Sequence, residues 1–502
     1  MPLYPFLFGL FPVLALYAHN SDQLTPDSLV VPCVLALAVA AVALFVLRWP
    51  CGNFQRSGMA SGLFVVLFFG YGHVHTLFSR SGPRQVVLAG AALLVIAMAA
   101  MVFAVVLISR CRRGWLPPAT KALNAIAAVM LLVPAFRIAL FEFRAPGQEQ
   151  VRAILSAGVP VSAGDEAGYP NILYLVPDRY PGESTLVELY GYDNSEFLDA
   201  LRERGFYVAG ESRCNFGRTD MSLASALNMS YLDSLFVRFG RRGVRRAFYW
   251  AIQDNEVARQ LRARGYRHLH FGTWWHTTSH GRRADGSYNR LSVSEFVMML
   301  YRMTMVYPAG AALGLNQHSE QWKRVHYKFD LLETLDSVPG PVFVFAHFLV
   351  PHEPYVLGRN GDFVSRLEQF RRGTTVGFSD QVTYVNQRLL VLVDRLTGAE
   401  AVRPWVIVIQ SDEGPHPPHN FEHRDSLQTL RAKFRILNAY YLPGVDSAVL
   451  YSDISPVNTF RVVFDSYFGF RYGLLPDRSL LVRDGGPCDV TEQVRYRSAV
   501  LP

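Results

Sequence analysis

Cysteine and lysine are scarce in this sequence of 502 residues. The five cysteines include no CxxC pair, which excludes a disulfide scaffold, a zinc finger and thioredoxin chemistry. Only four of the 49 basic residues are lysine, so arginine supplies nearly all of the positive charge. The four lysines are Lys121, Lys323, Lys328 and Lys433. Charged residues make up 18% of the chain and hydrophobic residues 50%, a balance that excludes a disordered protein.

The net charge is +8. An arginine bias of this kind is typical of a GC-rich genome, so we expect no nucleic-acid partner. An acidic lipid surface or a phosphorylated substrate fits the charge better.

Long apolar runs are concentrated in the first 143 residues. Five runs, each close to the roughly 20 residues that a bilayer core requires, predict five membrane-spanning helices. They cover about residues 3–19, 28–48, 60–79, 86–109 and 121–142. The short loops after the second and fourth runs are rich in arginine, and the loop after the first run has no cation. Because positively charged loops stay in the cytoplasm, we expect a multi-pass membrane protein whose chain after residue 143 is extracytoplasmic.

The rest of the chain has the pattern of an α/β domain. Three segments, 171–176, 341–346 and 405–410, are almost wholly apolar, as buried parallel strands are. Helical patterns such as 195–204 and 220–229 lie between them. We therefore expect α/β architecture.

The predicted domain organisation has three parts. The middle part contains helix breakers and no sustained apolar period, so we predict a linker with a short juxtamembrane helix. The parts are a five-helix transmembrane domain over 1–143, the linker over 144–169 and an extracytoplasmic domain over 170–502.

Ionisable residues follow each of the three predicted strands. Asp178 follows the first, His347 and His352 follow the second, and Asp412 with Glu413 follows the third. In open α/β sheets, reactive groups collect beyond the carboxyl ends of the strands. A single acidic residue after a strand is more often a helix cap. Because ionisable residues follow all three strands, that explanation is weaker here.

Thr219 lies where a helix is expected to begin. A helix N-terminus favours an anion, although Thr219 could simply cap the helix. A threonine hydroxyl needs a metal or a base before it can attack phosphorus or sulfur. Asp178, Asp412 and Glu413 could hold such a metal, with Thr219 as a fourth oxygen ligand. This set has no thiolate or imidazole, so Mn²⁺ or Mg²⁺ suits it better than Zn²⁺, which we keep as the alternative.

Three short motifs and the overall layout resemble the lipoteichoic acid synthase and phosphoethanolamine transferase branch of the alkaline phosphatase superfamily, which is sulfatase-like. The segment 217–220 (Gly-Arg-Thr-Asp) is similar to the segment that carries the nucleophile in lipoteichoic acid synthases. The segment 351–355 (Pro-His-Glu-Pro-Tyr) resembles their substrate-binding histidine segment. The segment 410–414 (Gln-Ser-Asp-Glu-Gly) stands where that family has Asp-His-Gly.

The resemblance implies a fold, a site and an activity. The fold is an extracytoplasmic alkaline-phosphatase/sulfatase-like α/β sandwich anchored in the cytoplasmic (inner) membrane of a bacterium. The catalytic residues are Thr219 and His352, the substrate-binding residues are His347, His352 and Arg218, and the cofactor is one divalent metal ion. The implied reaction moves a phospholipid-derived headgroup, such as glycerol phosphate or phosphoethanolamine, through a covalent threonine intermediate to a cell-envelope glycan or lipid.

Several positions keep other interpretations open. Glu413 replaces the family's metal-binding histidine and Asp178 replaces its glutamate, so the metal is not identified. Cys214 nearly fits the Cys-x-Pro-x-Arg signature of a true sulfatase, but Phe216 replaces the proline. We interpret Cys214 as a small, partly buried residue that could pair with Cys488.

Two alternative functions and two histidine clusters complete the predictions. A phosphodiesterase or sulfatase would use the same site, and a non-catalytic envelope scaffold is the second alternative. One cluster could form a second metal or lipid-headgroup site, although its spacing does not demand one, and the other could line the cleft. The first cluster is His268, His270, His276 and His280, and the second is His416, His419 and His423.

Overall fold

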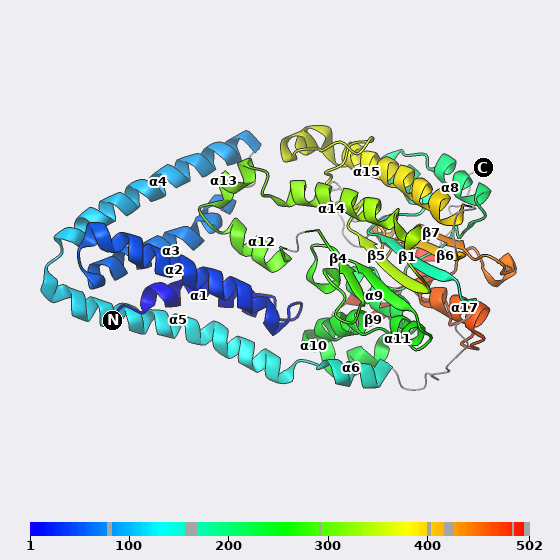
Figure 1. Cartoon of the computed structure of the whole chain (residues 1–502), viewed down its shortest axis with the longest axis horizontal. Coiled ribbons are helices and arrows are strands. Elements are labelled where there is room, and N and C mark those ends of the chain that lie inside the picture. The colour runs from blue at the N-terminus through cyan, green and yellow to red at the C-terminus, as the bar shows by residue number, and fades with distance from the viewer. Residues whose placement is uncertain are drawn as a thin grey trace. The chain divides into compact units, whose positions relative to one another are not determined.

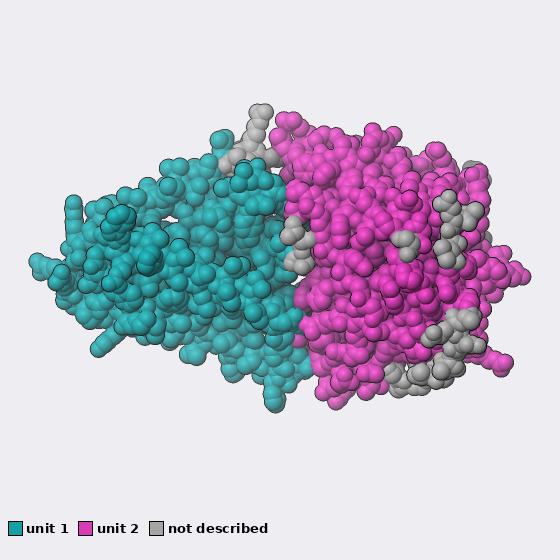
Figure 2. Space-filling model, viewed as in Figure 1, with its two compact units in different colours: residues 1–145, 293–317 teal, residues 146–292, 318–502 magenta. Residues whose placement is uncertain are grey.

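The computed structural model describes most of the chain as two units, which Figure 2 shows in different colours. The described residues are 1–77, 83–155, 168–290, 293–398, 403–415, 426–483 and 486–495. Unit 1 contains residues 1–145 and 293–317, and unit 2 contains residues 146–292 and 318–502. The expected boundaries assign the segment 293–317 to the extracytoplasmic domain, whereas its contacts belong to unit 1.

Five apolar helices form most of unit 1. They are α1 (Tyr4–His19), α2 (Val30–Cys51), α3 (Phe54–Leu77), α4 (Pro83–Arg110) and α5 (Leu116–Arg144). Four helical segments are long and apolar enough to cross a membrane, and α1, with 16 residues, is shorter. Large apolar side chains stay exposed on these helices, for example Phe45 and Val102, as expected where lipid is the solvent. The predicted order, apolar amino-terminal helices followed by an α/β domain, is confirmed (Figure 1).

Two short helices from the later part of the chain belong to the same unit. They are α12 (Glu295–Arg302) and α13 (Tyr307–Ala312). Phe296 of α12 is buried, and its ring packs edge-on against Tyr17 of α1 with 6.2 Å between centroids. With eight and six residues, these helices are too short to show the long apolar run by which the other helices of the unit are recognised.

The segment after α12 approaches the backbone of α3 closely at Gly72. The N–H of Gly72 donates to the carbonyl oxygen of Met303 at 2.9 Å, and the N–H of Met305 donates to the carbonyl oxygen of Phe68 at 3.0 Å. A Cβ atom on Gly72 would lie 2.4 Å from Cα of Met303. Only glycine therefore permits this backbone contact.

Unit 2 is built on a seven-stranded mixed sheet with the order β2-β7-β6-β1-β5-β3-β4. The strands are β1 (Asn171–Pro177), β2 (Tyr207–Val208), β3 (Arg267–Phe271), β4 (Gly286–Tyr288), β5 (Val342–Phe348), β6 (Trp405–Gln410) and β7 (Asn438–Tyr441). The central strand β1 pairs in parallel with β5 on one side and β6 on the other. These are the three strands that the apolar runs predict, and their parallel pairing is confirmed.

Alternate side chains of β1 enter separate cores on the two faces of the sheet. Leu173 and Leu175 point to one core, and Ile172, Tyr174 and Val176 point to the other. The first core is covered by α7 (Glu183–Tyr190), α8 (Ser195–Glu203), α14 (Gln317–Leu332) and α15 (Arg366–Thr397). The second is covered by α9 (Thr219–Asn228), α10 (Asp233–Gln253), α11 (Glu256–Arg262) and α17 (Pro456–Phe468) (Figure 1). Burial on both faces explains why the central strands are continuously apolar rather than alternating.

Smaller elements complete unit 2. They are α6 (Gln148–Leu155), α16 (Leu427–Phe434), α18 (Thr491–Arg495) and the two-stranded sheet of β8 (Leu480–Arg483) and β9 (Gly486–Asp489). The short helix expected in the linker is therefore present, and α6 packs on α10. Just before α6, the carbonyl oxygen of Pro146 accepts a hydrogen bond from Nε1 of Trp250 on α10 at 3.1 Å.

We expect Gly72→Ala to destabilise unit 1, because the new Cβ would overlap the backbone of Met303 and rigid overpacking typically costs about 1–3 kcal/mol. Gly70→Ala is the matched control on the same helix, since nothing lies within 4 Å of its Cβ position. The thermal midpoint of the detergent-solubilised protein should fall for Gly72→Ala only. Equal midpoints for the two variants would contradict the close contact.

Candidate metal and phosphoryl-transfer site

Three ionisable side chains converge at the carboxyl edge of the sheet. Asp178 follows β1, Asp412 follows β6, and His347 lies in β5, where its register partner on β1 is Val176. Ligand atoms from these three side chains all lie within 4.8 Å of one another, and all three side chains are buried. Three adjacent strands therefore bring two predicted metal ligands together with one predicted substrate residue.

Each of these residues has a buried polar atom without a hydrogen-bond partner among the described residues. The atoms are Oδ1 of Asp178, Oδ2 of Asp412 and Nε2 of His347. Buried polar atoms are normally satisfied. The other ring nitrogen of His347, Nδ1, hydrogen-bonds to Oγ1 of Thr278 at 2.8 Å, which leaves Nε2 for a ligand. The three residues thus fit a divalent metal ion.

The electrostatics of the site point in the same direction. Burial raises the pKa of Asp412 to about 6, and the charge of Asp178 adds to this shift. Burial raises the pKa of Glu413, and the charges of Asp412 and Asp178 raise it further. Burial would also raise the pKa of Asp178, but His352, His347 and Arg179 hold it below its usual value. Negative charge is therefore only partly compensated here, and a divalent cation would relieve the excess.

Glu413, the remaining predicted carboxylate ligand, is not one of the converging group. Its Oε1 lies 3.4 Å from Nε of Arg179, and its Oε2 lies 4.0 Å from Nζ of Lys433. His347 joins the group instead. The preference for Mn²⁺ or Mg²⁺ relied on a donor set without imidazole, and a set that contains His347 also suits Zn²⁺.

Thr219 is the first residue of α9, as its position before a helical pattern predicts. Its side chain is half-buried and acts on Asp412, lowering the pKa of that carboxyl. The neighbouring Arg218 directs Nη2 to Oδ2 of Asp220 at 2.7 Å. The nucleophile candidate thus lies beside one of the converging carboxylates, while Arg218 contacts a carboxylate outside that group.

His352 lies on the loop after β5 and contacts the same region. Its backbone N–H donates to the carbonyl oxygen of Asp178 at 3.2 Å, and its Nδ1 hydrogen-bonds to the carbonyl oxygen of Glu353. Burial lowers the pKa of His352, whereas the charge of Asp178 raises it. A carbonyl oxygen can only accept, so Nδ1 carries the hydrogen and Nε2 is the atom that can exchange a proton.

Sequence reasoning missed three cations of the site. Arg179 and Lys433 lie beside Glu413, and Nζ of the buried Lys328 donates to the carbonyl oxygen of His347. Arg179 has no sequence signal beyond its place next to Asp178. Lys328 and Lys433 do have a sequence signal, because they are two of only four lysines in a chain whose other basic residues are arginine.

Cys214 is buried and Cys488 is exposed, and both are free thiols, so the disulfide considered above does not form. Burial raises the pKa of Cys214 well above its usual value, and the charges of Glu413 and Asp412 add to this. The reactive thiolate is therefore disfavoured.

The first histidine cluster is packed into unit 2. His268 and His270 are buried, and burial lowers the pKa of His268 to about 3 and that of His270 to about 4. The ring of His276 stacks on Tyr249 at 5.2 Å between centroids, and Nδ1 of His280 hydrogen-bonds to Oγ of Ser279 at 3.0 Å. Among the described residues, metal-ligating side chains converge in threes only at the site above. His416, His419 and His423 lie outside the described residues.

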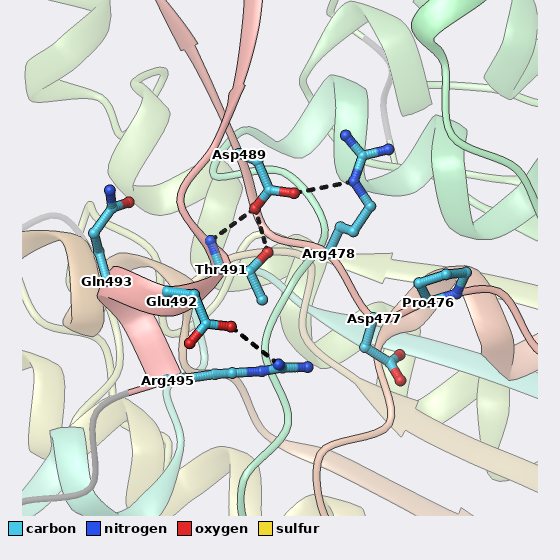
Figure 3. A pocket seen from close by; sticks show the side chains of 8 residues that line it. All are labelled: Pro476, Asp477, Arg478, Asp489, Thr491, Glu492, Gln493 and Arg495. Atoms are coloured by element: carbon cyan, nitrogen blue, oxygen red, sulfur yellow. Dashed lines mark hydrogen bonds and ion pairs between the residues drawn. The ribbon is translucent and has the colours of Figure 1, made fainter.

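A separate polar pocket of about 550 Å³ lies in the carboxyl-terminal segment (Figure 3). Four of its charges form two ion pairs: Arg478 Nε lies 3.1 Å from Asp489 Oδ2, and Arg495 Nη1 lies 3.2 Å from Glu492 Oε1. The lining residues are Pro476, Asp477, Arg478, Asp489, Thr491, Glu492, Gln493 and Arg495. Because these charges compensate each other, we assign no ligand to this pocket.

Comparison with known proteins gives structural neighbours only. No protein-family model and no curated protein matches the chain. The fold is similar to the carboxyl-terminal periplasmic domain of EptC from Escherichia coli, at 14% identity over 68% of this chain and 100% of that one, with a TM-score of 0.41.

Two further neighbours cover 92% and 64% of this chain. The integral membrane lipooligosaccharide phosphoethanolamine transferase A (EptA) from Neisseria meningitidis matches at 11% identity over 92% of this chain and 94% of that one, with a TM-score of 0.38. An alkaline phosphatase superfamily protein from Vibrio parahaemolyticus matches at 12% identity over 64% and 74%, with a TM-score of 0.37.

We expect the purified protein to bind a divalent ion with a stoichiometry of about one, because one converging group is present. Asp412→Asn should lose the ion, as it removes a charged ligand. Asp199→Asn, an exposed carboxylate on α8, is the control and should retain it. Elemental analysis after dialysis measures the content, and full metal content in Asp412→Asn would rule out this site.

The buried histidines predict an acid-side loss of stability. Folded His268 and His270 have pKa values far below the usual 6.5, so the unfolded chain binds more protons below that pH. Their contribution to stability is full above pH 6.5 and is lost as the pH falls toward about 4 and about 3. The slope should be about 1.4 kcal/mol per pH unit for each histidine. His268→Leu should flatten the pH dependence of the urea midpoint between pH 6 and 4, and an unchanged slope would contradict the assignment.

Proposed function

We propose that this chain is a membrane-anchored, metal-dependent phosphotransferase. It would move a phospholipid-derived headgroup, such as glycerol phosphate or phosphoethanolamine, through a covalent Thr219 intermediate to a cell-envelope glycan or lipid. The observation that carries the proposal is the position of Thr219 at the start of α9, where it acts on Asp412 beside the converging Asp178 and His347. A hydroxyl at a helix N-terminus, next to a carboxylate of the candidate metal site, is arranged for attack on an anionic centre.

A bound divalent ion would be held by Asp178, Asp412, His347 and the Thr219 oxygen, and it would lower the pKa of the hydroxyl and screen the phosphate charge. The protein groups account for the protons. Oγ1 of Thr219 forms the bond to phosphorus as its proton passes to the neighbouring carboxylate of Asp412. The bond between phosphorus and the diacylglycerol oxygen breaks, and that oxygen takes a proton from Nε2 of His352.

The second half of the reaction reverses these transfers. The acceptor hydroxyl gives its proton to Nε2 of His352 and its oxygen bonds to phosphorus. The bond between phosphorus and Oγ1 breaks, and Thr219 regains its proton from Asp412. Each group returns to its starting state, so no further reactant is required.

The apolar helices of unit 1 support a lipid donor rather than a soluble one. Four segments are long and apolar enough to cross a membrane, and a phosphodiester carried by a diacylglycerol is available only at a bilayer surface. Helices of this kind would hold the phosphoryl-transfer domain at a membrane, where a lipid donor is available.

We expect wild-type protein, incubated with labelled phosphatidylglycerol or phosphatidylethanolamine, to form a headgroup adduct on Thr219 that mass spectrometry detects. Thr219→Ala should lose the adduct and at least about 10³-fold of turnover, whereas Thr219→Ser should retain part of both. Thr374→Ala, an exposed threonine on α15, is the control.

The same assay separates the alternatives. Release of free headgroup without transfer to an added acceptor would favour a phosphodiesterase, and turnover of aryl sulfates alone would favour a sulfatase. Failure to form any adduct would overturn the phosphotransferase proposal.

A further inference from the structure

Arg179 has a backbone conformation that a residue with a side chain rarely adopts. Its φ angle is 61°, and among the described residues Met229 is the only other non-glycine residue with a positive φ. The left-handed region is unfavourable for such residues, and those held in it cluster at functional sites. Here the turn lets one residue face several site carboxylates at once.

The backbone and the side chain of Arg179 both engage acidic residues. Its N–H donates to Oδ1 of Asp412 at 3.1 Å, and its Nε lies 3.4 Å from Oε1 of Glu413 and 4.0 Å from Oδ1 of Asp178. Its charge also acts on His352, on the segment that resembles a substrate-binding motif. The two Nη atoms form no hydrogen bond with a described residue, and 18% of the side chain is exposed. Arg179 therefore keeps donors available for a ligand that enters the site.

Lys433 reaches the same carboxylate from the opposite side. It lies on α16, and its aliphatic stem packs on Gly217, where a Cβ would lie 2.7 Å from Cε of the lysine. Its Nζ is 4.0 Å from Oε2 of Glu413 and forms no hydrogen bond with a described residue. The glycine two residues before Thr219 thus leaves room for the stem of this lysine beside the nucleophile segment.

Glu413 is placed to orient these two cations. One carboxylate oxygen faces Arg179 and the other faces Lys433, and Glu413 is absent from the converging group of ligand atoms. Arg179 and Lys433 offset part of the buried negative charge and keep donors that suit an anionic ligand such as a phosphodiester.

Resting on the proposed function, we infer that Arg179 and Lys433 form a fixed pair of cations, oriented by Glu413, that binds the anionic oxygens of the phosphoryl group transferred at Thr219. An arginine fork and a lysine point charge are both suited to phosphate oxygens. Charges that are already in place stabilise the transition state without reorganisation. On this inference, Glu413 is an orienting residue rather than a metal ligand.

Inorganic phosphate is the probe that tests the pair. Full-length protein in detergent, loaded with Mn²⁺, is titrated with phosphate by calorimetry, and metal content is measured in parallel. Arg179→Gln and Lys433→Gln should each bind phosphate about 10- to 100-fold more weakly while keeping the metal. Lys323→Gln and Arg204→Gln, cations paired elsewhere with Glu320 and Asp394, should bind as the wild type does.

The double variant Arg179→Gln/Glu413→Gln leaves the net charge unchanged. It therefore tests whether Arg179 binds phosphate or only neutralises the charge of Glu413. It should stay weak, because the phosphate contact is still missing. Recovery of wild-type affinity in the double variant would overturn the inference, as would loss of the metal in Glu413→Gln or no phosphate binding in the wild type. If phosphate binding follows the expected pattern but no Thr219 adduct forms, the cation pair stands and the proposed function fails.

Discussion

Buried negative charge at one edge of the sheet is the constraint on which the site depends. Asp178, Asp412 and Glu413 are each at most 3% exposed, and carboxylates are costly to bury without compensation. This cost explains why groups that can offset negative charge surround the three carboxylates. Arg179 and Lys433 flank Glu413, and the N–H of Arg179 donates to Asp412 at the same edge.

The two apolar cores make this arrangement rigid. Because β1 is packed on both faces and paired with β5 and β6, the ends of three strands are held in one register. Behind His347, the hydroxyl of Thr278 contacts both Nδ1 of the histidine and Oγ1 of Thr273 at 2.9 Å, and Lys328 holds the histidine's carbonyl oxygen. Partners of this kind fix the orientation of a metal-binding imidazole, so the site is prepared before any ligand binds.

Two different solvents explain the rest of the chain. Unit 1 exposes apolar side chains that only lipid would solvate, whereas unit 2 buries its apolar residues in the two cores around a sheet. The division is not linear along the chain, since α12 and α13 belong to unit 1. Their backbone contact at Gly72 depends on the absence of one side chain, which a hydropathy pattern does not reveal.

The sequence alone determined the features that depend on local composition. Continuous apolar runs identified the central strands almost to the residue, the long helices of unit 1 and the candidate residues just beyond β1 and β6, because burial on both faces leaves an unbroken hydrophobic signal. Tertiary structure alone decided that His347 joins Asp178 and Asp412, that Glu413 faces Arg179 and Lys433, and that 293–317 packs with the apolar helices. The physical reason is that strand register, a left-handed turn and a close backbone approach arise from packing between distant segments, and no local pattern encodes them.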